Sequence, residues 1–304
     1  MARIELPQRG LHLEYESHGN DVDPAVFLVM GLGMQLLAWP PAMIQALVAG
    51  GLRVVTFDNR DVGLSGTGAM RPHTPLRRAT LAALWRLPYK PPYRIADMAD
   101  DTLALADALG IARFHLVGAS LGGMIAQSLA EAAPERVLSL TSIMSSAGPD
   151  AAPWPKLPVL WRFLKRPPKR AGLQKKVDFF VELFKVLGCF DDPEEVRVLR
   201  ERMTRTIQRA YNPPGTIRQL LAIVADRDRS AAVARIRCPT LIVHGAEDPL
   251  VPVRAAYNLV RLLPKARLEI IPGLGHYLPV WVAPLLAGHV LEHVAAIPGK
   301  VANR

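Results

Sequence analysis

Cysteine is nearly absent from this chain of 304 residues, which contains only Cys189 and Cys238. The two lie far apart in the sequence and show no CxxC spacing. A disulfide framework and a cysteine-based zinc site are therefore not expected, and we expect neither a metal nor another cofactor. So little cysteine fits a reducing compartment, and we expect a cytoplasmic protein.

Long uninterrupted apolar runs are also missing. Residues 1–10, MARIELPQRG, contain no apolar stretch after the arginine, so no secretory signal is expected. The most apolar stretch near the end of the chain, residues 278–297, is interrupted by Pro284, His289, Glu292 and His293. This interruption predicts a C-terminal helix rather than a membrane span.

Acidic residues are outnumbered, with 27 Asp and Glu against 37 Lys and Arg, which gives a net charge of +10. Much of this surplus lies in one segment, at Lys156, Arg162, Lys165, Arg166, Lys169, Arg170, Lys175 and Lys176. No nucleic-acid-binding motif accompanies it, so no nucleic-acid partner is expected. Because the segment also carries aromatics, weak contact with an anionic membrane surface or an anionic substrate stays open beside a plain solvated face. No oligomeric state is predicted.

Short, nearly continuous apolar runs are plentiful. They are AVFLVM (25–30), LRVVTF (52–57), RFHLVG (113–118), VLSLTSIM (137–144), TLIVHG (240–245) and RLEII (267–271). Such runs are typical of strands buried on both faces of a parallel sheet. LHLEYES (11–17) alternates apolar and polar residues instead, which predicts an antiparallel edge strand with one wet face.

Helix-like segments separate most of these runs, which predicts a doubly wound α/β sheet. The alternation stops in residues 148–235, which contain helix-like or proline-punctuated stretches and no convincing strand. We therefore predict a core of residues 1–147 and 236–304, with residues 148–235 inserted as a helical cap. Such a cap would lie over the carboxyl ends of the strands, where open α/β sheets bind ligands.

The stretch Gly118-Ala119-Ser120-Leu121-Gly122 matches G-x-S-x-G between an apolar strand and an Ala/Leu-rich helix. That context favours a nucleophile elbow, in which a sharp turn lifts the serine hydroxyl clear of the sheet. A phosphate-binding loop would need G-x-G-x-x-G or a Lys-Ser/Thr ending, and neither is present here. Ser120 is therefore the predicted nucleophile.

A serine hydroxyl needs a base, and that base needs a carboxylate to orient it. The chain order Ser…Asp…His selects Asp248, just past the TLIVHG strand, and His276, in the loop after RLEII. Both follow strand ends at the same sheet edge as Ser120. Asp150 is the alternative acid, because it too follows a strand.

An acyl-transfer reaction also needs hydrogen-bond donors for the oxyanion. The backbone N–H of Leu121, which follows the nucleophile, is one candidate. The other is the N–H of Leu32, in the loop Met30-Gly31-Leu32-Gly33 after the first apolar run. A simple glycine-rich turn is the alternative interpretation of that loop.

Taken together, these motifs resemble the serine α/β-hydrolase family over essentially the whole chain. The resemblance rests on VMGLGMQLLAWP (29–40), FDNRDVGLSG (57–66), DMADDTLALADALGI (97–111), HLVGASLGGMIAQ (115–127), PTLIVHGAEDPLVP (239–252) and PGLGHYLP (272–279). The MGLGMQ version is similar to a carboxylesterase-like branch that includes aclacinomycin-type polyketide methylesterases. It implies a triad of Ser120, His276 and Asp248, with oxyanion donors at Leu32 and Leu121.

The expected activity is that of a cofactor-free carboxylesterase acting on small to medium apolar esters, with methyl esters as a candidate. Met30, Gly31, Trp154, Trp161 and Tyr277 are the predicted substrate contacts. The same triad could instead serve a thioesterase, lysophospholipase, aminopeptidase or carbon–carbon bond hydrolase. A non-catalytic ligand-binding member of the fold is a further alternative.

Overall fold

The computed structural model describes residues 1–66, 75–85, 87–152, 155, 156, 159, 162 and 172–297. Within these residues eight strands form one sheet in the order β1-β2-β4-β3-β5-β6-β7-β8. The strands are β1 (Ala2–Leu6), β2 (Leu11–His18), β3 (Ala25–Val29), β4 (Arg53–Phe57), β5 (Phe114–Ala119), β6 (Val137–Ile143), β7 (Thr240–Gly245) and β8 (Arg267–Ile271). β2 is antiparallel to both of its neighbours, and the strands from β4 to β8 in the sheet are parallel.

Two predictions about the sheet edges were wrong. β2 is not an edge strand, because β1 pairs with it through a tight turn at Pro7–Arg9 and Gly10, and β1 takes the edge. β8 was expected to be buried on both faces, but it is the opposite edge and only Ile271 in it is buried. In both cases the residue pattern of a strand indicates how its faces are buried, but it does not indicate which strands lie beside it in the sheet.

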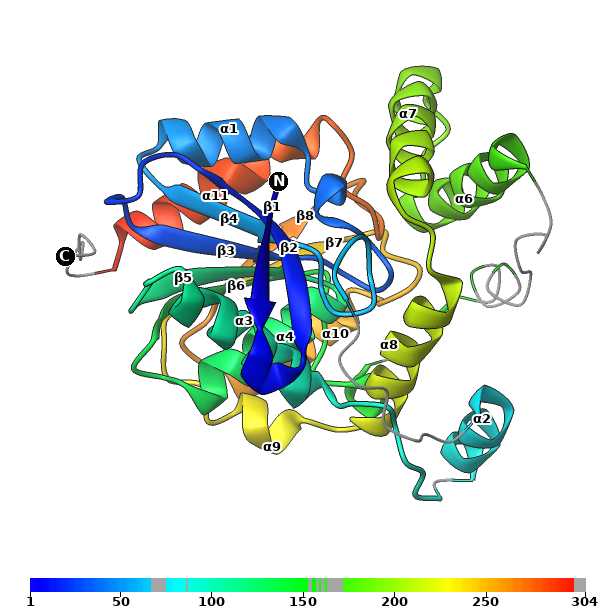
Figure 1. The fold of residues 1–304 in the computed structure, drawn as a ribbon, viewed down its shortest axis with the longest axis horizontal. Coiled ribbons are helices and arrows are strands. Elements are labelled where there is room, and N and C mark those ends of the chain that lie inside the picture. The colour runs from blue at the N-terminus through cyan, green and yellow to red at the C-terminus, as the bar shows by residue number, and fades with distance from the viewer. Residues whose placement is uncertain are drawn as a thin grey trace.

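Helices cover both faces of the sheet, which confirms the predicted α/β-hydrolase architecture (Figure 1). Val26 and Leu28 pack beneath α1 (Pro41–Ala49) and α11 (Val282–Ala295), the predicted C-terminal helix. Phe27 and Val29, which alternate with them, pack against the other face, covered by α3 (Ile95–Ala108), α4 (Leu121–Ala132) and α10 (Arg254–Leu262). Alternate residues of a strand point to opposite faces, so a strand buried on both must be apolar throughout.

Between β6 and β7 the described residues form helices and no strand. After a short 3-10 turn at Pro149–Ala151 these are α6 (Leu173–Gly188), α7 (Pro193–Arg209), α8 (Pro213–Ala225) and α9 (Ser230–Val233). α6 and α7 pack on one another through Val177, Val181, Leu199 and Met203, and they stand to one side of the sheet (Figure 1). A further helix, α2 (Leu76–Leu84), follows β4 and precedes α3 in the sequence. In space it stands away from the sheet, near α8 (Figure 1). None of the helices in the described part of the chain is long and apolar enough to span a membrane.

Candidate active site

Ser120 sits at the sharp turn between β5 and α4, with φ 55° and ψ −118°. This left-handed region of φ is unfavourable for a residue with a side chain, so the surrounding structure must hold it there. Glycine is required on both sides of the turn. A Cβ on Gly118 would overlap the Gly122 carbonyl oxygen, and one on Gly122 would overlap that of Val29. The glycines of G-x-S-x-G therefore allow the strand and the helix to approach each other closely.

His276 lies within hydrogen-bond distance of Ser120, in the loop after β8. Its Nε2 is 2.9 Å from Ser120 Oγ, and its Nδ1 is 2.7 Å from Asp248 Oδ2. Since a carboxylate accepts and does not donate, Nδ1–H donates to Asp248 and Nε2 is left to accept the serine proton. The backbone N–H of His276 donates to the carbonyl oxygen of Leu187 at the end of α6.

Asp248 is buried in the loop after β7, where its carboxylate has several partners. Its Oδ1 accepts the backbone N–H groups of Leu250 and Val251, at 2.9 and 2.8 Å. Its Oδ2 lies near His244 Nε2 as well as His276. Burial alone would raise the pKa of Asp248, but its interactions with His276 and His244 outweigh burial and hold that pKa below its usual range. The group is therefore a carboxylate at neutral pH.

The alternative acid, Asp150, lies in the 3-10 turn Pro149–Ala151, and its side chain is outside the described residues. The position beside His276 Nδ1 is occupied by Asp248. The structure thus brings Ser120, His276 and Asp248 into one hydrogen-bonded chain, from three loops that follow three different parallel strands.

The loop after β3 lies directly beside Ser120. A Cβ on Gly31 would be 3.2 Å from Ser120 Cβ and 3.8 Å from its Oγ. Gly31 to Met34 form a turn in which the Met34 N–H donates to the Gly31 carbonyl, and Gly33 has φ 67°. In the described part of the chain, no hydrogen bond uses the backbone N–H of Leu32 or Leu121. The two backbone N–H groups thus have no hydrogen-bond partner among the described residues.

Several residues that support this loop were not predicted from the sequence. Gln219 of α8, fully buried, accepts the Gly33 N–H at its Oε1 (2.8 Å) and donates from Nε2 to the Arg60 carbonyl (2.9 Å). Asn59 donates to the Met30 carbonyl at 2.8 Å. Ser145 donates to the Ser120 carbonyl at 2.7 Å. Gln219 lies 186 positions from Gly33, so no local pattern could have indicated this contact.

The helices between β6 and β7 contact the site at Tyr277, which follows His276 in the loop after β8. Tyr277 is buried against Phe184 and Phe190, with ring centroids 5.7 and 5.2 Å away, and Arg202 lies over its ring. Its hydroxyl has no hydrogen-bond partner among the described residues, and burial raises its pKa. Tyr277 thus joins the small apolar core of α6 and α7 to the loop that holds His276.

The other predicted substrate contacts have different positions. Met30 is buried in the cluster beneath α1 and α11, and Gly31 faces Ser120. Trp154 and Trp161 lie outside the described residues. No group of three His, Cys, Asp or Glu residues that could hold a metal ion occurs in the described ranges.

The sheet order, the strained serine turn and the hydrogen-bonded chain describe an α/β hydrolase. A family model described as "alpha/beta hydrolase fold" matches residues 24–282, so the chain belongs to that family. The family resemblance predicted from the motifs is thereby confirmed.

Within the family, the chain is similar to "Rhodomycin D methylesterase DnrP" of Streptomyces peucetius. The two are 28% identical over 308 residues, covering 92% of this chain and 94% of that protein. Among solved structures, the enol-lactonase from Burkholderia xenovorans LB400 superposes with a TM-score of 0.71 at 21% identity, covering 94% of this chain and 97% of that one. The 2-hydroxy-6-oxo-6-phenylhexa-2,4-dienoate hydrolase from Rhodococcus sp. strain RHA1 gives 0.72 at 22%, with 94% and 95% covered. The methylesterase relative agrees with the branch predicted from the MGLGMQ loop, and the two structures support the fold.

Proposed function

We propose that this protein is a serine hydrolase that cleaves carboxylic esters through an acyl-enzyme. The observation that carries the proposal is the chain from Asp248 Oδ2 through His276 to Ser120 Oγ, with distances of 2.7 and 2.9 Å. These are the distances at which a histidine can take a serine proton while a carboxylate stabilises the resulting imidazolium.

The reaction begins when Ser120 Oγ attacks the ester carbonyl carbon and its proton passes to His276 Nε2. The tetrahedral intermediate collapses, the carbon–oxygen bond to the alcohol breaks, and Nε2 returns the proton to the leaving oxygen. Water then attacks the acyl-enzyme while Nε2 accepts one of its protons. The carboxylic acid leaves, and the proton returns to Ser120. Asp248 remains a carboxylate throughout.

The negative charge of each tetrahedral intermediate is held by the backbone N–H groups of Leu32 and Leu121. The turn at Gly31–Met34 supports this role, because the peptide between Leu32 and Gly33 is fixed by the bond from the Gly33 N–H to Gln219. With that peptide fixed, the adjacent Leu32 N–H stays free beside Ser120. A preformed arrangement of donors lowers the cost of reorganisation when charge develops.

The proposed substrates are small to medium apolar esters, methyl esters among them. The name of the Streptomyces peucetius relative supports the methyl ester. We treat residues 148–235 as the cap of the site, supported by the contacts of α6 with the His276 loop. The free thiols of Cys189 and Cys238 support a reducing cytoplasm as its location.

Labelling with a fluorophosphonate probe tests the nucleophile. We expect one covalent adduct on Ser120, and none on Ser120→Ala, with unchanged circular dichroism of the variant. A folded wild-type protein that resists the probe would refute the serine hydrolase.

The ester class is tested with p-nitrophenyl esters of increasing acyl length, methyl esters, thioesters and aminoacyl-p-nitroanilides. Turnover of short and medium oxygen esters is expected to exceed that of the other substrates. Faster cleavage of anilides or thioesters would leave Ser120 as the nucleophile but replace the esterase by an aminopeptidase or a thioesterase.

A further inference from the structure

The surplus of positive charge over negative charge arises from two segments that contain no acidic residue. Residues 62–96 hold six Lys and Arg, and residues 151–177 hold eight. The remainder of the chain therefore has 23 basic residues against 27 acidic ones, so it is net negative. A surplus of one sign that is gathered in this way concentrates the electrostatic field on particular surfaces.

Within the first of these segments, helix α2 and Trp85, which follows it, expose a stripe of basic and apolar side chains. Arg77, Arg78, Leu81 and Trp85 fall within about 100° of one another at the 100° per residue of an α-helix, and all four are exposed. Leu81 is 57% exposed, Trp85 69% and the following Leu87 59%. The buried side of the helix carries the small residue Ala79. Large apolar side chains this exposed, grouped on one element, indicate a binding surface.

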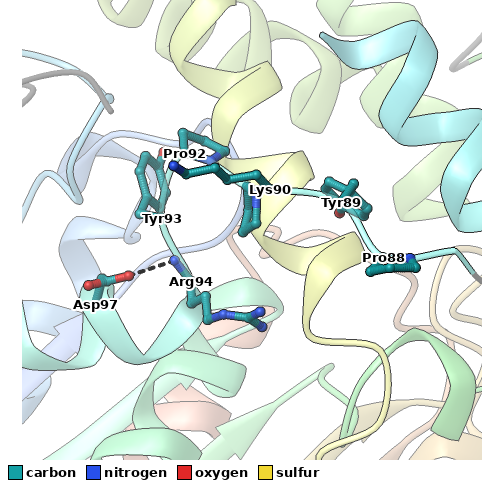
Figure 2. A pocket seen from close by; sticks show the side chains of 8 residues that line it. Pro88, Tyr89, Lys90, Pro92, Tyr93, Arg94 and Asp97 are labelled. Carbon is teal, nitrogen blue, oxygen red and sulfur yellow. Dashed lines mark hydrogen bonds between the residues drawn. The ribbon is translucent and has the colours of Figure 1, made fainter. Parts of the chain in front are cut away.

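Both α2 and Tyr89, which follows it in the chain, contact α8. α2 lies against α8, and the Tyr89 hydroxyl donates to the Leu221 carbonyl of α8 at 2.6 Å. Beyond it, residues 88–94 and Asp97 line a cavity of about 530 Å³ (Figure 2). None of these lining residues belongs to the site at Ser120. The stripe is therefore held in place by α8.

We propose that α2, Trp85 and Leu87 form a docking surface for a lipid bilayer that contains anionic phospholipids. Leu81, Trp85 and Leu87 enter the boundary between headgroups and acyl chains, while Arg77 and Arg78 meet lipid phosphates. This combination of Trp and Leu with arginine and lysine, without any carboxylate, is what interfacial helices use.

The charge pattern disfavours a two-fold dimer through this surface, because two acid-free basic surfaces repel each other. A bilayer also accepts protruding side chains without a matching groove, whereas a folded acidic partner would need one for Trp85. The proposal is independent of the ester hydrolysis assigned to Ser120.

Co-sedimentation of the full chain with vesicles tests the surface. The protein carries Ser120→Ala, so that turnover of lipid cannot affect the result. We expect binding to vesicles of phosphatidylcholine mixed with phosphatidylglycerol, little binding to phosphatidylcholine alone, and weaker binding as salt is raised.

Two double variants separate the contributions. Arg77→Gln with Arg78→Gln is expected to lower the partition coefficient on anionic vesicles by at least about tenfold, since each cation contributes about one factor of five near such a surface. Leu81→Gln with Trp85→Gln is expected to lower it by a similar factor. Tyr257→Gln, an exposed aromatic between Arg254 and Arg261 on α10, is the matched control and should bind as before.

Several outcomes would overturn the proposal. One is equal binding of all variants, and another is loss of binding only when Lys165 and Arg166, in the second basic segment, are changed to Gln. Vesicle binding that persists in high salt, or a change from dimer to monomer in light scattering when Leu81 and Trp85 are replaced, would do so as well.

Discussion

Two histidines are buried at opposite ends of the same sheet, and their surroundings differ in one respect. His276 is 8% exposed at the carboxyl end and faces the carboxylate of Asp248. His115 is 4% exposed in β5, where its Nδ1 meets the Ser139 hydroxyl at 2.8 Å and the charged groups that act on it are His293 and Arg113. Burial, reinforced by the electrostatic effect of these two neighbours, lowers the pKa of His115 to about 4.

The comparison teaches which buried histidine can act as a base. A proton on His115 would be a buried charge with no counter-charge, so that imidazole stays neutral. A proton on His276 would be matched by the adjacent carboxylate. Burial by itself therefore makes a structural histidine, and burial beside a carboxylate makes one that can carry a proton for the duration of a reaction.

Replacing the carboxylate of Asp248 should leave His276, like His115, without a negatively charged partner. In Asp248→Asn we expect kcat/KM for p-nitrophenyl esters to fall by about 10³- to 10⁴-fold, because the imidazolium loses its counter-charge and the wrong tautomer is favoured. Stopped-flow labelling by the fluorophosphonate should slow in parallel. Asp150→Asn is the control, and a larger loss there than in Asp248→Asn would show that the acid is misassigned.

The pH dependence of stability tests the other histidine. Because the pKa of His115 in the folded protein is about 4 against an ordinary 6.5, the unfolded chain binds more protons between those values. The stabilisation is complete above pH 6.5 and is lost as pH falls to about 4, by about 3 kcal/mol in all. Urea unfolding at several pH values should show this loss. In His115→Gln the loss should be smaller by that amount, and an unchanged profile would contradict the assignment.

Buried polar side chains hold both histidine regions, but only those at the carboxyl end of the sheet lie beside the proposed reaction. Gln219, which holds the loop next to Ser120, is one of them. Gln219→Met removes the acceptor of the Gly33 N–H, so we expect kcat to fall about tenfold or more with KM nearly unchanged. Gln219→Glu retains an acceptor and should recover part of the rate. Ser139→Ala, beside His115, should leave kcat unaltered. A rise in KM alone for Gln219→Met would place Gln219 in substrate binding instead.

The smallest effect is expected from Tyr277→Phe. The Tyr277 hydroxyl is buried without a partner among the described residues, so its removal should raise the free energy of unfolding by less than about 1 kcal/mol. Ser139→Ala removes a paired hydroxyl and should lower it by about the same amount. If Tyr277→Phe instead raises KM several-fold without changing stability, the hydroxyl binds substrate.

The sequence was sufficient to predict which residues lie together where each one is marked by a pattern next to it in the chain. Ser120, Asp248 and His276 each follow an apolar strand within a few residues, and parallel strands bring such positions to one edge. The positions of β2 and β8 in the sheet could not be predicted, because residue patterns do not identify neighbouring strands. Gln219 and Leu187 were missed for a related reason. Their contacts join segments far apart in the chain, and nothing near them in sequence marks the contact.

The bond from the His276 N–H to the Leu187 carbonyl has a consequence for protein engineering. The last turn of α6 supplies a backbone acceptor to the loop of the proposed base, and a Cβ on Gly275 would be only 2.5 Å from that same carbonyl oxygen. A chimera that takes its insertion from a relative must therefore reproduce the path of the chain at Leu187 and Gly188, where a Cβ on Gly188 would overlap the Phe190 ring. Transplanted specificity should succeed only when this junction is moved together with the 272–279 loop as one module.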